Sequence, residues 1–407
     1  MNRRIFYWGL YDFANSIVLV AFLFYFSQWL VEEQGRPAWW YNVALVAASL
    51  LFILSTPMLS RTIDATGKKL RGLRIWTGIA LLSLGSVAVI AALSNTLDVL
   101  ATMLYAFSMY AYLMAFLYFT PMLSDLSTPE NRARVSGIGQ GMNSFGQAVG
   151  LILTLPFAIG TITLFGDPGR AQALLISVPL FGLFALPLLA LYRETEHAVI
   201  LRTARDSVNP LSLVRIILAH RPLAFLFLAY FFFSDALLTF TNNFPLFLEK
   251  VFHSPDTIKA FLTIGILLLA SIGAPVFGCI ADRIGHRKTL VMILLGYMVL
   301  FPALAITSYF PLAILICLIA GFLFGPVWGI SRAMVAQLAP PEFIASSFSY
   351  YIIAERFATF VGPLVWVAVL MRFGEGELGY RLGLIAMGVL GAFGLAILGR
   401  VKEASPA

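Results

Sequence analysis

The chain has 407 residues, of which 60% are hydrophobic and only 12% are charged, and its formal net charge is +7. A soluble domain carries about 25% charged residues, so a water-facing surface would lack half of its usual charge. Together with a mean hydropathy of +0.89, these values exclude a single soluble globule, a disordered chain and a collagen-like chain. The basic residues do not cluster in one block, so we expect no nucleic-acid partner.

Long apolar runs predict an all-α integral membrane protein with twelve transmembrane helices. Sixty percent of 407 residues is about 244, and a bilayer-spanning helix takes about 20. The runs are too long for barrel strands and do not alternate with a period of two. The predicted spans are approximately 5–31, 39–60, 72–93, 97–123, 135–159, 171–192, 222–248, 258–281, 289–308, 311–338, 345–371 and 380–400. The first run is longer than the core of a secretory signal, about 7–15 residues, so we expect it to be a retained membrane helix.

The distribution of Lys and Arg predicts the orientation of these spans. With the N-terminus in the cytoplasm, 19 of the 27 basic residues fall on that side, six fall outside, and Arg332 and Arg356 lie within helices. This excess follows the positive-inside rule. We therefore expect both termini to be cytoplasmic and the protein to reside in the cell's inner membrane. Cys279 and Cys317 each lie in an apolar run, which excludes a disulfide framework.

The chain divides after the sixth predicted span, where its only long connection occurs. We predict two six-helix bundles, 1–192 and 222–407, joined by a cytoplasmic linker at 193–221. The two halves also resemble each other. Residues 56–69 align with 274–287 at an offset of 218, and six residues between Leu126 and Gly150 recur between Leu338 and Gly362 at an offset of 212. Duplicated parallel halves are a transporter architecture, with the substrate site between them near the midplane.

One segment of the repeat carries a distinct motif, Gly-x-x-Ala-Asp-Arg-x-Gly-x-Arg-Lys, at residues 278–288. It resembles the cytoplasmic loop signature of the major facilitator superfamily, which implies a gate at the cytoplasmic side. Gly permits close helix contact and a sharp turn, and Asp can cap the N-terminus of a neighbouring helix. The first copy departs from the motif at Ser60 and Ala65. The candidate gate residues are Asp64, Gly67, Gly278, Asp282, Arg283, Gly285 and Arg287.

Three further segments narrow the resemblance. Tyr-Asp-Phe-Ala-Asn-Ser at 11–16, Arg-Val-Ser-Gly-Ile-Gly at 134–139, and residues 331–340 with Gly-Pro-Leu at 362–364 look like the vacuole effluxer-like branch of that superfamily. This branch includes autophagy-related vacuolar amino-acid effluxers and many prokaryotic relatives of unknown substrate. The resemblance implies transport by alternating access, but membership of a branch does not fix the cargo.

Charged and polar side chains inside the predicted spans are the candidates for substrate binding or ion coupling. A charge at a helix centre costs about 2.5–3.5 kcal/mol on insertion scales, so each one requires a reason. Several polar residues recur at helical spacing and give the first, fifth, seventh and eleventh spans one polar face each. The candidates are Asp12, Asn15, Asn143, Asp235, Asn242, Arg332, Tyr351, Glu355 and Arg356.

Structural explanations compete with these functional ones. Asp12 is also consistent with an interface or helix-packing residue, and Asp235 with a static ion pair to Arg332. Glu355 and Arg356 are adjacent and point about 100° apart on a helix, so one of them is a candidate for an interhelical bridge. Asn143 is also consistent with interhelical hydrogen bonding. The glycines between 137 and 150 predict close helix packing rather than a nucleotide site, because no strand precedes them.

The sequence thus favours a secondary active or facilitative transporter of a small organic solute, with efflux as one direction. An acid and an arginine facing one cavity suit a zwitterion such as an amino acid. We expect no cofactor and no metal, a monomer in a lipid bilayer, and any coupling to H⁺ or another ion to rest on Asp12, Asp235 or Glu355. The alternatives are a transport-fold sensor or scaffold without cargo, and an integral-membrane enzyme, which would need a metal or nucleophile cluster that the sequence lacks.

Overall fold

A computed structural model describes residues 2–37, 39–93, 96–194, 220–357 and 360–401, and within these ranges it is all-helical. The chain separates into two compact units. Unit 1 comprises Met1–Leu126 and Met142–Ser207, and unit 2 comprises Ser127–Gly141 and Val208–Ala407. The division falls within one long helix, α6 (Arg132–Ala158), whose first part belongs to unit 2 and whose second part belongs to unit 1.

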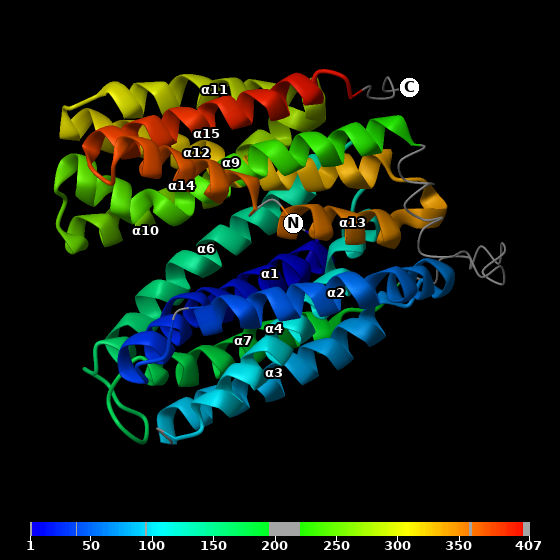
Figure 1. Cartoon of the computed structure of the whole chain (residues 1–407). Helices are drawn as coiled ribbons and strands as arrows, with labels where there is room; N and C mark the ends of the chain where they lie inside the picture. The colour runs from blue at the N-terminus through cyan, green and yellow to red at the C-terminus, as the bar shows by residue number, and fades with distance from the viewer. Residues whose placement is uncertain (1, 38, 94–95, 195–219, 358–359, 402–407) are drawn as a thin grey trace. The chain divides into compact units, whose positions relative to one another are not determined.

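Unit 1 consists of long helices whose sequences are almost entirely apolar. Its first helix continues into two π-helical segments, η1 and η2, so that one helical stretch runs from Arg3 to Glu33. Besides the second part of α6, the elements are α1 (Arg3–Ala21), η1 (Phe22–Phe26), η2 (Trp29–Glu33), α2 (Trp39–Thr66), α3 (Lys69–Leu93), α4 (Asp98–Phe119), η3 (Thr120–Met122), α5 (Leu123–Leu126) and α7 (Ala171–Leu191). Within this unit α1 packs on α7, and α4 packs on both α2 and α3 (Figure 1).

Unit 2 repeats the same type of helix. Besides the first part of α6, its elements are α9 (Arg221–Phe252), α10 (Asp256–Ile284), α11 (His286–Ile306), α12 (Phe310–Leu338), η4 (Pro341–Phe343), α13 (Ile344–Phe357), α14 (Val361–Phe373) and α15 (Glu377–Leu398). The closest pairs are α9 with α15 and α10 with α12, and α11 packs on both α12 and α15 (Figure 1).

The prediction of a twelve-helix membrane protein is confirmed. Among the described residues, eleven helical stretches are long and apolar enough to cross a bilayer. The twelfth is α6, which has 27 residues and therefore a length of about 40 Å at 1.5 Å per residue. It was predicted from the sequence at 135–159, but its hydropathy is lower than that of the other eleven because glycines and amide side chains occupy much of its sequence.

Among the described residues the predicted span at 345–371 is not one continuous helix, because Phe360 forms a bend between α13, which is described to Phe357, and α14, which begins at Val361. Hydropathy remains high through this region, so the sequence pattern predicted one continuous helix. Pro363 lacks an N–H and is tolerated in the first turn of a helix but not in its interior. The pair Gly362-Pro363 therefore fits the start of a new helix.

Glycines bring helix backbones into contact within each unit. In unit 2, a Cβ on Gly141 would lie 2.5 Å from the Ser271 carbonyl oxygen, and one on Gly278 would lie 2.5 Å from the Ala133 carbonyl oxygen. In unit 1, a Cβ on Gly146 would overlap the carbonyl oxygen of Phe13. Helices in a bilayer associate through small residues of this kind. The interpretation of the 137–150 glycines as packing residues is therefore confirmed.

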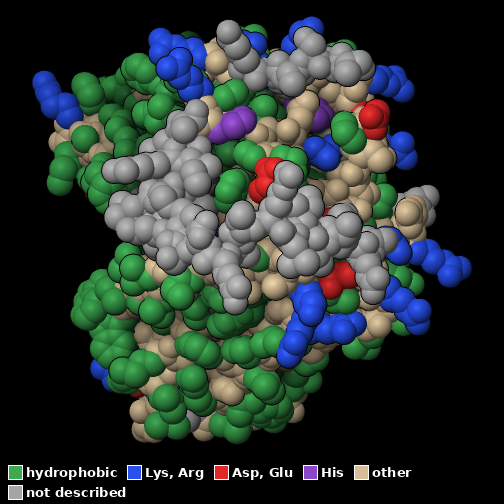
Figure 2. All heavy atoms as spheres, turned by 90° about the vertical axis from the view of Figure 1, so that its right-hand side faces the viewer, with side chains coloured by type: hydrophobic (Ala, Val, Ile, Leu, Met, Phe, Trp, Pro, Cys, Tyr) green, Lys and Arg blue, Asp and Glu red, His purple; other side chains and the backbone are tan. Residues whose placement is uncertain are grey.

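Apolar side chains also cover much of the helix exteriors. Leu54, Leu82 and Ile306 are each at least 75% exposed, and Met371 is 85% exposed, a distribution expected for surfaces that contact lipid. Lys and Arg side chains instead gather at helix ends. In unit 1 Lys68, Lys69 and Arg71 lie at the α2–α3 connection, and in unit 2 Arg283, Arg287 and Lys288 lie at the α10–α11 connection. Figure 2 shows several Lys and Arg side chains, in blue, on the face it draws.

Candidate functional site

A line of polar side chains connects α1 with α6 in unit 1. Asn143 donates a hydrogen bond from Nδ2 to Asp12 Oδ1 at 3.1 Å, and Gln147 donates from Nε2 to Asn143 Oδ1 at 2.8 Å. Asp12 is only 1% exposed. A buried carboxylate is costly without such donors, so this line keeps an ionisable group inside an apolar helix pair.

The next polar residue of α1 faces a different neighbour. Asn15 is buried and donates from Nδ2 to the hydroxyl of Tyr112 on α4 at 3.0 Å. Tyr11, one residue before Asp12, shares a hydrogen bond with Thr77 on α3 at 2.7 Å. The segment that carries the Tyr-Asp-x-Ala-Asn-Ser pattern therefore contacts three helices: Tyr11 contacts α3, Asn15 contacts α4 and Asp12 contacts α6.

In unit 2, Arg332 on α12 is held by the first half of α6. It is 4% exposed and donates from Nε to Ser136 Oγ at 3.0 Å and from a terminal nitrogen to the Ser136 carbonyl at 2.8 Å. Ser136 in turn donates to the carbonyl of Gly329, one turn before Arg332, at 2.6 Å. These bonds fix the position of a buried positive charge.

The end of α13 carries a second group of charged side chains. Glu355 accepts a hydrogen bond from the Tyr230 hydroxyl at 2.8 Å and pairs with Arg356 at 2.8 Å. The Tyr351 ring, one turn earlier, lies 4.4 Å from the Tyr230 ring between centroids. Although neighbouring helix positions point in different directions, the long Arg356 side chain reaches back to Glu355. The two residues therefore form an ion pair with each other.

Asp235 on α9 has partners other than the arginine considered in the sequence. It is fully buried and accepts a hydrogen bond from the backbone N–H of Gly362 at 2.6 Å, with the Thr239 hydroxyl 3.4 Å away. Within the described part of unit 2, Asp235 forms no ion pair with Arg332. Asn242, predicted on the same helix face, is exposed.

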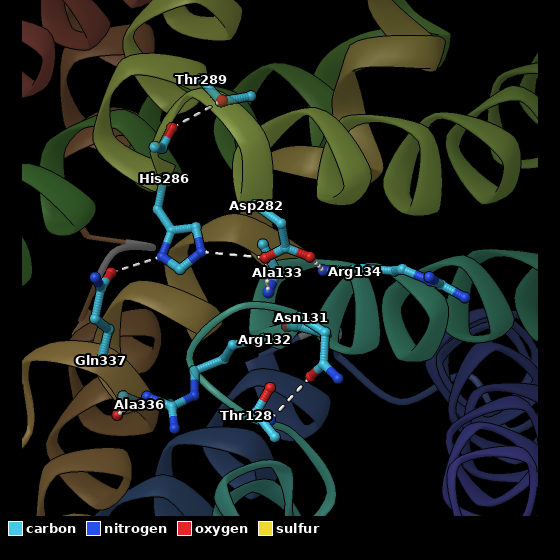
Figure 3. A network of polar contacts seen from close by, with 12 residues as sticks. Thr128, Asn131, Arg132, Ala133, Arg134, Asp282, His286, Thr289, Ala336 and Gln337 are labelled. Carbon is cyan, nitrogen blue, oxygen red and sulfur yellow. Dashed lines mark hydrogen bonds and ion pairs between the residues drawn. The ribbon is translucent and has the colours of Figure 1, made fainter. Parts of the chain in front are cut away.

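The α10–α11 connection of unit 2 forms a polar network around the N-terminus of α6 (Figure 3). Asp282 accepts hydrogen bonds from the backbone N–H groups of Ala133 at 2.8 Å and Arg134 at 2.9 Å. Asp282 thus makes a helix-capping contact of the kind that the motif suggested. The His286 ring lies between Asp282 and Gln337, with Nε2 3.4 Å from Asp282 Oδ1 and Nδ1 2.6 Å from Gln337 Oε1.

The other motif residues have separate structural uses. Gly285 has a φ of 102° and Gly67, its counterpart in the repeat, has a φ of 66°, a region that disfavours side chains. Arg287 donates from Nε to the Leu398 carbonyl at 3.2 Å, which ties the start of α11 to the end of α15. Arg283 is exposed.

Several of these groups were not anticipated. Ser136 lies in the 134–139 segment that carries the family resemblance but was not a candidate site residue, and Tyr230 lies about one turn before Asp235 on the same predicted helix. In unit 1, Lys69 Nζ lies 2.6 Å from Asp125 Oδ2 in a largely buried ion pair. Glu194 accepts hydrogen bonds from the backbone N–H groups of Lys69 at 2.7 Å and Leu70 at 2.6 Å. The basic end of the first repeated motif was the available signal for this pair.

An open pocket of about 710 Å³ lies apart from these groups in unit 1, between η1 and η2 on one side and the end of α6 and the loop before α7 on the other. Its wall includes Glu33 and Arg170, whose side chains form an ion pair at 3.2 Å, and Gln28, which accepts from Arg170 Nε at 2.8 Å. None of the predicted substrate-binding residues lines this pocket.

Comparison with known proteins identifies the family. The profile of the Major Facilitator Superfamily matches residues 119–363 and 244–406, which together cover well over half of the chain. An uncharacterized MFS-type transporter of Bacillus subtilis, YxiO, is 23% identical over 420 residues, covering 97% of this chain and 94% of the relative.

Solved transporter structures share the fold. A bacterial homologue of the iron transporter ferroportin, in its outward-facing state, superposes with a TM-score of 0.74 at 12% identity, over 98% of this chain and 99% of the other. The human organic anion transporter MFSD10 superposes with a TM-score of 0.69 at 17% identity, over 97% and 99%. The chain therefore belongs to the Major Facilitator Superfamily, a family of secondary transporters rather than enzymes, and is a multi-pass integral membrane protein.

Proposed function

We propose that this transporter carries a small zwitterionic solute of the amino-acid type by alternating access of two six-helix halves, 1–192 and 222–407, joined by the linker 193–221. The observation that carries the proposal is the presence of a buried arginine on α12 and a half-buried carboxylate on α13, two helices of unit 2 that are in contact. Such charges are costly in an apolar span and are typical of substrate or ion pathways.

The chemistry of unit 2 supports recognition of both ends of a zwitterion. Arg332 is held in place by Ser136, and a guanidinium in fixed geometry suits a carboxylate. Glu355 is 26% exposed at its side chain and offers a negative charge to an ammonium group. Tyr351 and Arg356 flank this carboxylate and would complete the polar surface.

Unit 1 offers the candidate for ion coupling. Asp12 is a buried acid bonded by Asn143, with Asn15 one turn further along α1. We assign coupling to H⁺ or another ion to this group, together with Glu355. The resemblance to the vacuole effluxer-like branch supports efflux as the direction of transport. The Asp64 and Asp282 loops would act as gates on the cytoplasmic side, where both termini of a monomer in the inner membrane would lie.

Counterflow in proteoliposomes tests the substrate class. Vesicles loaded with L-alanine should accumulate labelled L-alanine, and external L-alanine should compete. N-acetyl-L-alanine lacks the ammonium charge and L-alanine methyl ester lacks the carboxylate, so neither should compete comparably. Equal competition by both derivatives would reject zwitterion recognition, and failure of all common amino acids to exchange would reject the class.

A matched pair of variants tests the assignment of Glu355. Glu355→Gln keeps the size of the side chain but removes its charge, and we expect the rate of counterflow to fall by at least about tenfold, since charge-assisted bonds contribute about 1.5–3 kcal/mol. Glu375→Gln makes the same change at an exposed position between α14 and α15 and should leave the rate unchanged. Equal rates for the two variants would remove Glu355 from the substrate site.

A further inference from the structure

The two parts of the eleventh span are both attached to one helix, α9. Tyr230 on α9 donates to Glu355 near the end of α13, and Asp235 on α9 accepts from Gly362 at the start of α14. Asp235 follows Tyr230 by five positions on the same helix, a rise of about 7.5 Å. One rigid helix thus holds the chain on both sides of the place where α13 ends and α14 begins.

The start of α14 requires an external acceptor. The N–H groups of the first helical turn have no partner within their own helix. Phe360, at the N-cap position of α14, makes no side-chain capping bond, and Pro363 has no N–H to donate. The carboxylate of Asp235 supplies an acceptor to Gly362 at 2.6 Å. A side chain from another helix therefore performs the capping that the local sequence does not provide.

Gly362 is required for this approach. A Cβ at this position would lie 2.7 Å from Asp235 Oδ1 and 3.0 Å from the Asp235 carbonyl oxygen, and would overlap the Thr239 hydroxyl. The absence of a side chain lets the N-terminus of α14 pack directly on α9. Gly362 therefore allows α14 to approach α9, and Asp235 supplies the hydrogen-bond acceptor for the Gly362 N–H.

We propose that Asp235 is a positioning residue, which fixes the start of α14 and thereby the end of α13 with Glu355 and Arg356, and that it does not bind substrate or carry the coupling ion. Its fully buried carboxylate is engaged by Gly362 and Thr239. The inference refines the site of the proposed function, but the capping role itself does not depend on which solute is transported.

Amide hydrogen exchange tests the capping role without any substrate. Asp235→Asn keeps an acceptor oxygen for Gly362, and Asn caps helices about as well as Asp. We therefore expect wild-type exchange rates for Asp235→Asn in peptides covering 361–370. Asp235→Ala removes the acceptor, and loss of a cap of about 1 kcal/mol predicts about fivefold faster exchange there. Gly362→Ala should have the same effect by blocking the approach, and it serves if Asp235→Ala does not fold.

The pH profile of L-alanine counterflow tests the second part of the proposal. Asp235→Asn should retain the wild-type profile and a rate within about threefold, because the positioning role needs an acceptor and not a titratable charge. An altered profile with normal exchange protection would identify Asp235 as a titrating group and overturn the proposal. Normal protection in both Asp235→Ala and Gly362→Ala would overturn it too. If wild-type protein does not exchange L-alanine, the substrate class fails while hydrogen exchange still decides the capping role.

Discussion

The capping contact of Asp282 provides a direct test of how unit 2 is held together at its polar end. Asp282 is 9% exposed at its side chain and accepts two backbone N–H groups at the start of α6. Replacing a capping residue by Ala costs about 0.5–2 kcal/mol, and removing a negative charge near a helix N-terminus costs about 0.3–1 kcal/mol more. For Asp282→Ala we expect a loss of about 2 kcal/mol, because both N–H groups lose their acceptor.

Asp282→Asn separates the hydrogen bonds from the charge. The amide keeps one acceptor oxygen, so we expect an intermediate loss of about 1–1.5 kcal/mol, made up of the charge and one of the two hydrogen bonds. For a unit of this size about 1 kcal/mol corresponds to about 2–4 °C in Tm. Thermal unfolding in detergent should therefore rank the variants as wild type, then Asp282→Asn, then Asp282→Ala.

The neighbouring residue supplies the control. Arg283 is exposed, and removal of an exposed side chain away from special contacts usually changes stability by less than about 0.5 kcal/mol. Arg283→Ala should unfold close to wild type. If Asp282→Ala unfolds at the temperature of Arg283→Ala, the two hydrogen bonds do not stabilise the start of α6 and the reasoning is wrong.

Three other variants test separate parts of the structure. Gly146→Ala should lower the free energy of unfolding by about 1–3 kcal/mol through overpacking against Phe13. Its control in the same unfolding assay is Gly78→Ala in α3, where a Cβ meets no atom within 4 Å, and this change should be neutral or stabilising. Lys69→Met leaves the Asp125 carboxylate in a largely buried site without its cation, and should lower the free energy of unfolding by about 2–3 kcal/mol. The double variant Lys69→Met/Asp125→Asn should recover part of that loss. Additive effects in this double-mutant cycle would show that the two side chains are not coupled. Tyr230→Phe removes the hydrogen bond to Glu355, which contributes about 1 kcal/mol, and should slow L-alanine counterflow several-fold. The control Tyr297→Phe loses a hydrogen bond to the Ala320 carbonyl and should leave the counterflow rate unchanged.

The helices were predictable because the bilayer constrains them strongly. A segment that crosses hydrocarbon must satisfy its backbone internally and must be about 20 residues long, so apolar runs reveal spans directly. The glycine packing of α6 was predictable for a related reason, since close approach of two backbones excludes side chains and leaves a spacing of four residues. The turn at Gly285 follows from the same conformational argument.

The partners of the charged residues were not predictable, because they depend on which helices become neighbours. Arg332 and Ser136 are separated by 196 residues, and nothing near either residue specifies the other. Asp235 was considered as a partner for an opposite charge, whereas its partner is a backbone N–H. Hydropathy measures transfer of side chains to lipid and does not record where a helix starts. The pair Gly362-Pro363 was the only local signal of that start.

The low hydropathy of α6 has a physical explanation in its contacts. Its first part packs its glycine backbone on α10 within unit 2, and its second part packs Gly146 and Gly150 on α1 within unit 1. Lipid tails provide no hydrophobic drive for helix association, so helices in a bilayer associate through close packing and hydrogen bonds. Small residues allow backbone contact, and amides such as Asn143 find hydrogen-bond partners in unit 1. The low hydropathy of α6 therefore accompanies backbone packing on α10 within unit 2 and on α1 within unit 1, and polarity in a predicted span indicates protein contact before it indicates a substrate.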